Sequence, residues 1–459
     1  MSPKLYLEAR KQKQYDEVII DGCPYFPYLN VQIPNAAALC VDDNDDDDHS
    51  KVFKISMQAI IARSFFPSSD IMAEQDPASW TITKVTGGNT NQLYCISGMN
   101  KSGKNKNKNN NSIPNSVLVR IFGGEGMIDR DVETSTYSSL AQQGLALKYY
   151  GRFGNGRMEE MLIGWKTLTE EDMMILQISD EIARQLAILH TTYVVPDYLI
   201  EHHDTRTIGT GGIAQPTLWT QLYPWLERAL QQQFKNEYDT ERISKLQPSL
   251  TTLKQEIDWL KLRIIDPKSS IGFCHNDLLA SNIMMNTNST SDDDKDKNDE
   301  SNNNGTVLST TRMPTPCAPI LQFIDYEYGG INYYSYDIAN HFNEYAGGTA
   351  EEDNSTPNYE RRPSKEQQIK FIESYVKEYN NNTNTNTNTT AVTVNDIYTE
   401  VNGFILANHL VWGLWGILQA SSEGCEDGLD YIQYAKCRFD QYRSDKQNYL
   451  STSTATNLN

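Results

Sequence analysis

The stretch that decides how this chain is interpreted is Gly272-Phe-Cys-His-Asn-Asp-Leu-Leu-Ala-Ser-Asn-Ile-Met284. The apolar run Ile271 to Cys274 predicts a short buried strand, and the residues that follow it are polar. Asp277 precedes Asn282 in the order and spacing of loops that transfer phosphoryl groups, where the aspartate accepts a hydroxyl proton and the asparagine binds Mg²⁺. We therefore predict that Asp277 and Asn282 are catalytic.

A second stretch, Leu321-Gln-Phe-Ile-Asp-Tyr-Glu-Tyr-Gly-Gly330, places Asp325 at the end of another apolar run. A proton-accepting Asp, a metal-binding Asn and a further metal-binding Asp form the set that phosphoryl transfer needs. The alternative is that Asp277 and Asn282 decorate an ordinary loop and that Asp325 ends a buried strand, because short motifs recur by chance. Two motifs in the right order, each beside a strand-like run, favour the functional interpretation.

The net charge of −20 is concentrated along the chain. Two tracts, Asp42–Asp48 and Asp292–Glu300, account for half of it. Binding to nucleic acid depends on Lys and Arg that neutralise phosphates, so an acidic chain argues against a nucleic-acid partner. The same charge is compatible with a cationic substrate.

The cysteines and the N-terminus indicate where the protein works. The seven cysteines lack paired spacing, and their odd number leaves one thiol over, which is typical of a reducing compartment. Met1–Lys13 is charged and lacks the apolar core of a signal peptide. We identify no apolar run long enough to span a bilayer. We therefore expect a cytoplasmic protein without membrane insertion.

Polar low-complexity tracts divide the chain, and we interpret them as surface loops: Asp42–Asp48, Lys101–Ser116, Asn286–Thr315 and Asn380–Thr390. Between them, the patterns predict strands first and helices later. The predicted strands are Trp80–Lys84, Gln92–Ile96 and Val117–Ile121, with short strands flanking Arg157–Ile163. The predicted helices are Val52–Phe65, Arg130–Gln143, Ser179–His190, Leu218–Phe234, Leu246–Leu262, Lys365–Tyr379, Val394–Ala420 and Asp427–Tyr442. This order indicates an α+β fold with two lobes.

Several separated motifs resemble one known family, the choline/ethanolamine kinases. They are His275-Asn-Asp-Leu-Leu, Asn282-Ile, Phe323-Ile-Asp-Tyr-Glu-Tyr, Tyr336-Asp-Ile-Ala-Asn-His-Phe-Asn-Glu-Tyr-Ala-Gly347, His409-Leu-Val-Trp-Gly-Leu-Trp415 and Tyr434-Ala-Lys-Cys-Arg-Phe439. The resemblance covers about residues 80 to 445 and keeps the motifs in order. Asp277-Leu-Leu and the stretch Asn340-His-Phe-Asn-Glu-Tyr-Ala-Gly347 are most similar to the ethanolamine branch.

The resemblance implies a two-lobed, protein-kinase-like fold with a nucleotide cleft between the lobes. We expect an N-terminal extension over residues 1–50 that is partly disordered, and a strand-rich, nucleotide-binding N-lobe over 51–163. The helical C-lobe, over 164–445, would carry catalysis, substrate binding and the low-complexity insertions. Residues 446–459 are expected to form a disordered tail. The implied cofactors are ATP and Mg²⁺, the implied partner is a small amino alcohol, and the oligomeric state stays open, a homodimer included.

The nucleotide residues are expected in the first lobe. The turn Thr86-Gly-Gly-Asn-Thr-Asn91 has residues that are typical of an ordinary hairpin, but glycine also lets backbone N–H groups approach a phosphate closely. The family places its phosphate loop here. Arg120, in a strand that is otherwise apolar, would contact phosphates and pair with Glu133 on the following helix, unless it merely faces solvent. The residues expected to bind the nucleotide are Gly87, Gly88, Asn89, Asn91, Arg120, Glu133 and, through backbone groups that meet adenine, Met161 and Leu162.

Metal and acid–base roles are expected in the second lobe. Asp277 would accept or orient the hydroxyl proton. Asn282 and Asp325 would hold Mg²⁺, an ion that prefers oxygen ligands. Glu327 would share a strand face with Asp325 and bind a second ion, with a surface glutamate as the competing interpretation.

The substrate pocket rests on aromatic residues and one acid. Trp412 and Trp415 are three apart and share a helix face, which more often belongs to a core than to a ligand cage. In choline kinases, tryptophans at the matching positions line the cation pocket through cation–π attraction. The resemblance adds Glu344 as a negative charge and Tyr434 as another aromatic wall. Asp337 and His341 are expected to brace the fold.

The predicted activity is ATP-dependent phosphorylation of the ethanolamine hydroxyl to phosphoethanolamine. This is the first step of phosphatidylethanolamine synthesis by the CDP-ethanolamine route. The alternatives are a choline kinase, a dual choline/ethanolamine kinase, and a kinase for another small amino alcohol or an aminoglycoside. A further alternative from another class is a pseudokinase that acts as a binding module, although such a module has no need for an intact set of Asp277, Asn282 and Asp325.

Overall fold

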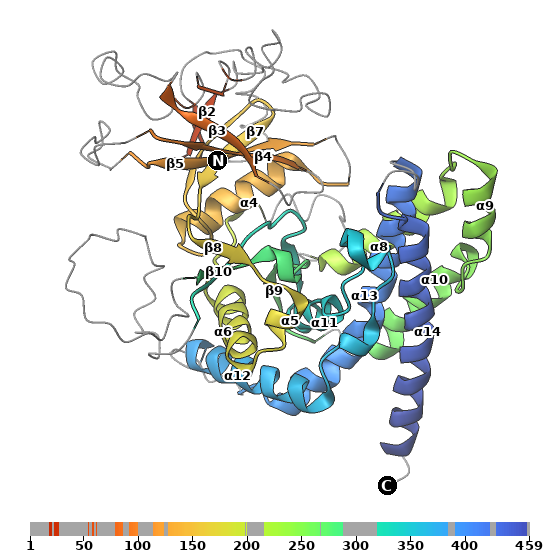
Figure 1. Ribbon diagram of the computed structural model, residues 1–459. Helices are drawn as coiled ribbons and strands as arrows, with labels where there is room; N and C mark the ends of the chain where they lie inside the picture. Colours follow the sequence, from red (N-terminus) through yellow and green to blue (C-terminus); the bar gives the residue numbers. More distant parts are fainter. Residues whose placement is uncertain are drawn as a thin grey trace. The chain divides into compact units, whose positions relative to one another are not determined.

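The chain forms two compact units, divided between Gly164 and Trp165, and each is described by itself. The computed structural model describes residues 18–20, 23–26, 54, 57–58, 61, 79–85, 91–99, 113–123, 127–197, 199, 215–266, 268–287, 319–383, 391–422 and 428–456. Figure 1 shows that the first unit carries the larger sheet and that the second carries most of the helices.

The first unit is built on a seven-stranded sheet with the order β1-β2-β6-β7-β5-β4-β3. Neighbouring strands are antiparallel except for β2 and β6, which run parallel. The strands are β1 (Val18–Ile20), β2 (Cys23–Phe26), β3 (Thr81–Val85), β4 (Asn91–Ser97), β5 (Ser116–Phe122), β6 (Tyr149–Phe153) and β7 (Gly156–Glu160).

The apolar pattern of β5 explains how this sheet acquires a core. Val117, Val119 and Ile121 alternate along the strand and are at most 4 % exposed. They pack with residues of β4, β6 and β7 in one buried cluster. The helix α4 (Arg130–Gln142) begins at Asp129, whose side chain accepts hydrogen bonds from the backbone N–H groups of Asp131 and Val132. This N-cap fixes the start of the helix.

The second unit carries two small sheets that hold the predicted motifs. β10 (Ile283–Asn286) is the middle strand between β11 (Leu321–Phe323) and β8 (Trp165–Thr167). β9 (Ile271–Cys274) pairs antiparallel with β12 (Gly330–Tyr333). Both apolar runs beside the motifs, around residues 271–274 and 320–324, are therefore strands as predicted.

Helices make up most of the second unit (Figure 1). The long helix α13 contacts α14, α11, α12 and α8, while α6 contacts α12. The helices are α5 (Glu170–Met173), α6 (Leu176–Thr192), α8 (Thr217–Gln231), α9 (Glu237–Ser244), α10 (Leu250–Trp259) with the π-helix η3 (Leu260–Ile264), α11 (Tyr334–Glu344), α12 (Lys365–Thr383), α13 (Val394–Ser422) and α14 (Tyr431–Thr456), together with the short 3₁₀-helices η4 (Ala280–Asn282), η6 (Glu351–Asp353) and η7 (Tyr359–Arg361).

The α+β prediction is confirmed, with corrections to individual elements. The predicted helix Leu246–Leu262 begins only at Leu250, after Pro248, because proline restricts the residue before it and cannot donate a backbone hydrogen bond. β1 and β2 lie in the segment expected to be an extension, and their three and four residues are too short for a pattern to reveal. Of the predicted helix Val52–Phe65, only residues 54, 57–58 and 61 are described, and they are helical.

Helix α14 extends beyond its predicted end at Tyr442. It continues to Thr456, past residue 446, where we expected a disordered tail. Lys446 pairs with Glu256 and lies 4.0 Å from the ring centroid of Trp259, so contacts with α10 hold this part of the helix.

Helix α13 also corrects the expectation that the chain has no apolar segment of membrane-spanning length. By length and composition its residues Val394–Ser422 would suffice. However, 89 % of its most apolar window is buried inside the protein, as in a core helix.

Candidate active site

The loop after β9 brings Asp277 and Asn282 together. Asn276 turns the chain with a positive φ of 66°, a conformation that asparagine adopts more readily than most residues. Five residues after Asp277, Asn282 Nδ2 donates to the backbone carbonyl of Asp277 at 2.8 Å and to its Oδ2 at 3.3 Å. Both side chains are 9 % exposed.

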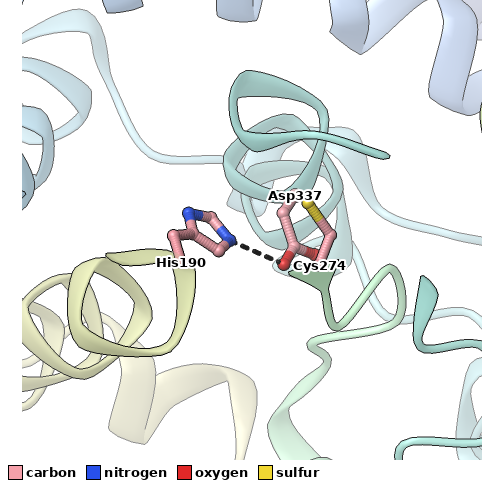
Figure 2. A group of neighbouring side chains, drawn as sticks. All are labelled: His190, Cys274 and Asp337. Carbon is pink, nitrogen blue, oxygen red and sulfur yellow. Dashed lines mark hydrogen bonds and ion pairs between the residues drawn. The ribbon is translucent and has the colours of Figure 1, made fainter. Parts of the chain in front are cut away.

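Asp337, in the first turn of α11, holds this loop in place. Its Oδ2 accepts the backbone N–H of His275 at 2.7 Å, and its Oδ1 accepts that of Asn276 at 2.8 Å. His190 Nε2 approaches the same carboxylate at 3.1 Å (Figure 2). Burial works to raise the pKa of Asp337, but the hydrogen bonds and charges of His190 and His275 outweigh it and lower the pKa. The predicted bracing role of Asp337 is confirmed.

The loop has a second brace in His341, one turn further along α11. Its Nδ1 lies 2.9 Å from the backbone carbonyl of Leu278. Burial lowers the pKa of His341 to about 4, so the ring is neutral near pH 7 and Nδ1 donates the bond. The bracing role predicted for His341 is also confirmed.

His190, Cys274 and Asp337 carry the atom types of a metal site, with donor atoms within 4.8 Å of one another (Figure 2). However, both Asp337 oxygens already accept backbone N–H groups. Burial, aided by the charge of Asp337, raises the pKa of the Cys274 thiol well above its usual value, whereas a metal needs the thiolate. The protonated thiol donates instead to the carbonyl of Tyr333 at 3.5 Å. We interpret the cluster as a hydrogen-bonded support of the loop.

The second motif is joined to the first by backbone hydrogen bonds. The N–H of Ile324 donates to the carbonyl of Asn282 at 2.9 Å, and the carbonyl of Ile324 lies 2.9 Å from His275 Nε2. Asp325 follows with a positive φ of 62°. Because β11 ends at Phe323, the expected strand face shared with Glu327 does not form. A turn brings carboxylate oxygens of Asp325 and Glu327 within 4.8 Å of each other.

These residues fit a Mg²⁺ ion. The amide nitrogen of Asn282 is engaged with Asp277, which leaves the amide oxygen as the atom available to a cation. Asp325 and Glu327 bring carboxylate oxygens within 4.8 Å of each other, and the backbone hydrogen bond between Ile324 and Asn282 joins this turn to Asn282, so the atoms that these residues offer are oxygens only. Mg²⁺ prefers such ligands, usually one or two carboxylates completed by phosphates and water.

Negative charge accumulates around Asp277. Burial raises its pKa most, and the charges of Glu344, Glu327 and Asp325 raise it further, while Arg438 acts in the opposite direction. Like charges disfavour one another in a water-poor site unless a cation joins them. The arrangement therefore suits ligands that bring positive charge to Asp277.

An aromatic cluster lies on α13 and the elements around it. The Trp412 and Trp415 rings meet edge to face with centroids 5.6 Å apart, and Tyr434 lies 5.9 Å from Trp415. Trp412 Nε1 donates to Asn340 Oδ1 at 2.8 Å, and Trp415 Nε1 donates to the Tyr328 hydroxyl at 2.9 Å. Trp415 is only half-buried, so the core does not enclose this side chain completely.

Glu344 joins this cluster through an arginine that sequence reasoning missed. Arg438 Nη2 pairs with Glu344 Oε1 at 2.5 Å and donates to the Tyr434 hydroxyl at 2.7 Å. Arg438 thus connects Glu344 with Tyr434, two residues that the resemblance assigns to the substrate. The charge of Glu344 also raises the pKa of Asp277, so this group of residues acts electrostatically on the loop after β9.

The first unit contains a buried network of charges around Arg120. Arg120 lies on the opposite face of β5 from Val119, yet it is only 4 % exposed because its Nε pairs with Glu159 Oε1 at 2.9 Å. Glu133 pairs instead with Arg157 at 2.6 Å and with Arg130 at 2.7 Å. The expected pairing of Arg120 with Glu133 is therefore corrected: Glu159 is its ion-pair partner, and Arg157 also bonds Glu159 at 2.6 Å. Burial opposes ionisation of Glu133, but the arginines lower its pKa to about 2.

The other residues that were expected to bind the nucleotide are described only in part. Gly87, Gly88 and Asn89 lie outside the described residues. Asn91 opens β4 and its Oδ1 accepts the backbone N–H of Gly123 at 3.5 Å. Met161 and Leu162 lie half-buried between β7 and β8.

Comparison with known proteins decides the family. The sequence profile described as choline/ethanolamine kinase matches residues 82–443. This chain belongs to the choline/ethanolamine kinase family. It is 31 % identical to ethanolamine kinase 1 of Mus musculus over 370 residues, which is 80 % of this chain and 84 % of that protein. It is 30 % identical to probable choline kinase 2 of Arabidopsis thaliana over 340 residues, or 73 % of this chain and 79 % of that protein.

Among solved structures, the choline/ethanolamine kinase fold recurs in the ethanolamine kinase of Plasmodium vivax. The TM-score is 0.62 at 23 % identity, covering 87 % of this chain and 91 % of that one. The protein-kinase-like fold implied by the resemblance is thereby confirmed. As a member of the family, the chain is a kinase that acts on an alcohol.

Within this choline/ethanolamine kinase, three residues of the site escaped sequence reasoning. Tyr328 lies inside a quoted motif, but nothing in its spacing indicates a hydrogen bond to Trp415. Glu159 and Arg438 are single charged residues among others on a strand and a helix. Only their burial distinguishes them from other charged residues. That burial depends on their ion-pair partners, which lie 39 and 94 positions away in the sequence.

Proposed function

We propose that this protein transfers the γ-phosphoryl group of ATP to the hydroxyl of ethanolamine. The product, phosphoethanolamine, is the first intermediate of phosphatidylethanolamine synthesis by the CDP-ethanolamine route, and the proposed place of action is the cytoplasm. One observation carries the proposal. The carboxylates expected to act on the metal, Asp325 and Glu327, and the Glu344 carboxylate expected to meet the ammonium group all raise the pKa of Asp277, the residue expected to act on the hydroxyl.

In this proposal Asp277 accepts or orients the hydroxyl proton. Phosphoryl transfer needs little covalent chemistry from the protein, so positioning and charge stabilisation dominate. The hydrogen bonds from Asn282 and the brace at Asp337 support such a role, because they fix the loop before substrate arrives. A raised pKa also makes the Asp277 carboxylate a better proton acceptor.

Asn282, Asp325 and Glu327 would hold Mg²⁺ through oxygen atoms. Mg²⁺ supplies charge that neutralises the transferring phosphate. The protein residues would fix where that charge lies, since carboxylate oxygens of Asp325 and Glu327 lie within 4.8 Å of each other. The charge of the ion would also offset the acidity gathered around Asp277.

The first unit would bind the nucleotide. Arg120 would contact phosphates, with Glu159 as the group that orients it and Glu133 acting through Arg157. The phosphate loop would use Gly87, Gly88, Asn89 and Asn91. Backbone groups at Met161 and Leu162 would meet the adenine ring.

The preference for ethanolamine over choline rests on Glu344 and on the relatives. Ethanolamine's primary ammonium carries three N–H donors that need oxygen acceptors, whereas a trimethylammonium group has none and depends on aromatic faces. Glu344 would supply such an acceptor, and Arg438 joins it to Tyr434, whose ring meets that of Trp415. A choline or dual kinase is the second candidate, supported by the aromatic walls and by the choline kinase relative in Arabidopsis thaliana.

Steady-state turnover tests the proposal. Purified protein with Mg-ATP should release ADP on addition of ethanolamine, with a higher kcat/KM than for choline. An equal or higher kcat/KM for choline contradicts the preference. Binding of ATP without turnover of either amino alcohol would instead support the pseudokinase alternative.

A further inference from the structure

Arg438 is a buried cation beside a pocket that is proposed to receive a cation. It lies on α14, is 1 % exposed, and has partners on three helices. It contacts Glu344 of α11 at 2.5 Å, Asn408 of α13 at 3.4 Å and Tyr434, one turn earlier on α14, at 2.7 Å. The positive charge of this guanidinium opposes the binding of an ammonium ion, so we expect Arg438 to favour that binding in another way.

The first part of that role concerns the Glu344 carboxylate. Arg438 bonds one of its oxygens, Oε1. Within the described part of the chain, the other oxygen, Oε2, accepts no hydrogen bond. Glu344 is 6 % exposed and ends α11, so its side chain has few alternative orientations. One oxygen is thus fixed and the other remains for an N–H donor of a ligand.

The second part concerns the aromatic wall. Nε and Nη2 of Arg438 donate to the Tyr434 hydroxyl at 2.9 and 2.7 Å. The Tyr434 ring in turn meets Trp415 edge to face at an angle of 78°. The planar fork of one guanidinium therefore fixes an acid and an aromatic ring relative to each other, which a lysine ammonium cannot do.

We propose that Arg438 is a positioning residue for the amino-alcohol substrate, holding Glu344 and Tyr434 so that the free carboxylate oxygen accepts an N–H of a primary ammonium. This inference rests on the proposed function of the same pocket. It implies selectivity, because a displaced carboxylate harms a ligand with N–H donors more than a trimethylammonium ligand, which relies on the rings.

The test compares Arg438→Lys with Arg362→Lys. The control residue forms another arginine–carboxylate pair with α14, to Asp445 at 2.7 and 3.0 Å, without touching Glu344 or Tyr434. In Arg438→Lys, the KM for ethanolamine should rise about tenfold or more, since an oriented charge-assisted hydrogen bond is lost. The KM for ATP should change less than about twofold, because Arg438 makes no contact expected to bind the nucleotide. The ratio of kcat/KM for choline to that for ethanolamine should also increase.

A purely structural arginine gives a different result. Both variants would then lower the Tm, and the KM for ethanolamine would stay unchanged in both, which overturns the proposal. If Arg438→Lys does not fold, Tyr434→Phe decides, since it keeps the ring and removes the hydroxyl that Arg438 holds. An ethanolamine KM raised about threefold supports the proposal, as one hydrogen bond of the network is lost. An unchanged KM overturns it.

Failure of the proposed function is recognised separately. Wild-type protein that phosphorylates neither amino alcohol contradicts the proposed activity. The role of Arg438 is then decided by calorimetric binding of ethanolamine itself. Binding that weakens in Arg438→Lys and persists in Arg362→Lys supports the role, and equal binding in both variants or no binding to wild type overturns it.

Discussion

Replacing Glu159 with glutamine tests the charge balance inside the first unit. Glu159 is 2 % exposed and accepts hydrogen bonds from Arg120 Nε at 2.9 Å and Arg157 Nε at 2.6 Å. Burial works against its charge, but the two arginines keep its pKa below the usual value. Glutamine has nearly the same shape, and its amide oxygen can take the place of Oε1, which accepts both hydrogen bonds, but it lacks the negative charge that offsets the two arginines.

The expected loss of stability follows from the two arginines that stay buried after the Glu159 charge is removed. Arg157 is fully buried and Arg120 is 4 % exposed, so neither guanidinium can turn to water. Breaking a buried ion pair by removing one partner costs about 3–5 kcal/mol. In a unit of this size, that corresponds to a fall in Tm of roughly 10 °C.

The neighbouring Glu160→Gln is the matched control. Its carboxylate lies 3.8 Å from Lys148, a pair that is partly exposed, with the lysine side chain 47 % accessible. Exposed pairs contribute about 0–1 kcal/mol, so the Tm of this variant should stay within a few degrees of wild type, by the same conversion. Thermal unfolding followed by circular dichroism compares the two substitutions on one strand.

Activity gives a second readout. Since Glu159 orients Arg120, Glu159→Gln should raise the KM for ATP, while the KM for ethanolamine stays within about twofold. A Tm for Glu159→Gln that falls no further than that of Glu160→Gln would refute the reasoning about buried charge. A normal KM for ATP would refute the orienting role.

Three further predictions concern the second unit. Asp277→Asn should bind ATP normally but lose kcat by far more than tenfold, the equivalent of about 1.4 kcal/mol, because the proton acceptor is gone; turnover within that limit would contradict its role. Asp325→Ala should lower kcat about a hundredfold or more, as charge stabilisation is lost; an unchanged Mg²⁺ titration at wild-type rate would argue against metal binding. Burial also lowers the pKa values of His341 and His409 from 6.5 to about 4. The unfolded chain binds these protons first as the pH falls, so the free energy of unfolding should decrease below about pH 6.5. By pH 5 the loss should be about 2 kcal/mol for each ring. Urea unfolding at pH 7 and pH 5 measures this effect, and equal stabilities would show that the two rings do not titrate as inferred.

Much of the fold was accessible from the sequence, because its signals are local. The alternation of apolar residues in β5 and the periodicity of α6, α12 and α13 predicted these elements within a few residues. Errors arose where local signals compete or fade. Pro248 delayed the start of α10, and contacts of Lys446 with Glu256 carried α14 past its expected end. The strands β1 and β2 are too short to show a pattern.

The sequence by itself determined the family and the pairing of Asp277 with Asn282, since these two residues lie within one short loop and interact directly. Tertiary structure alone decided the partners of buried charges. Arg120 was expected to form an ion pair with Glu133, but it pairs with Glu159 on the neighbouring strand β7. Arg438 gains its place only because α11 and α14 meet, 94 residues apart in sequence. Motif spacing records which residues are adjacent along the chain, whereas the environment of a buried charge is set by elements that only folding brings into contact.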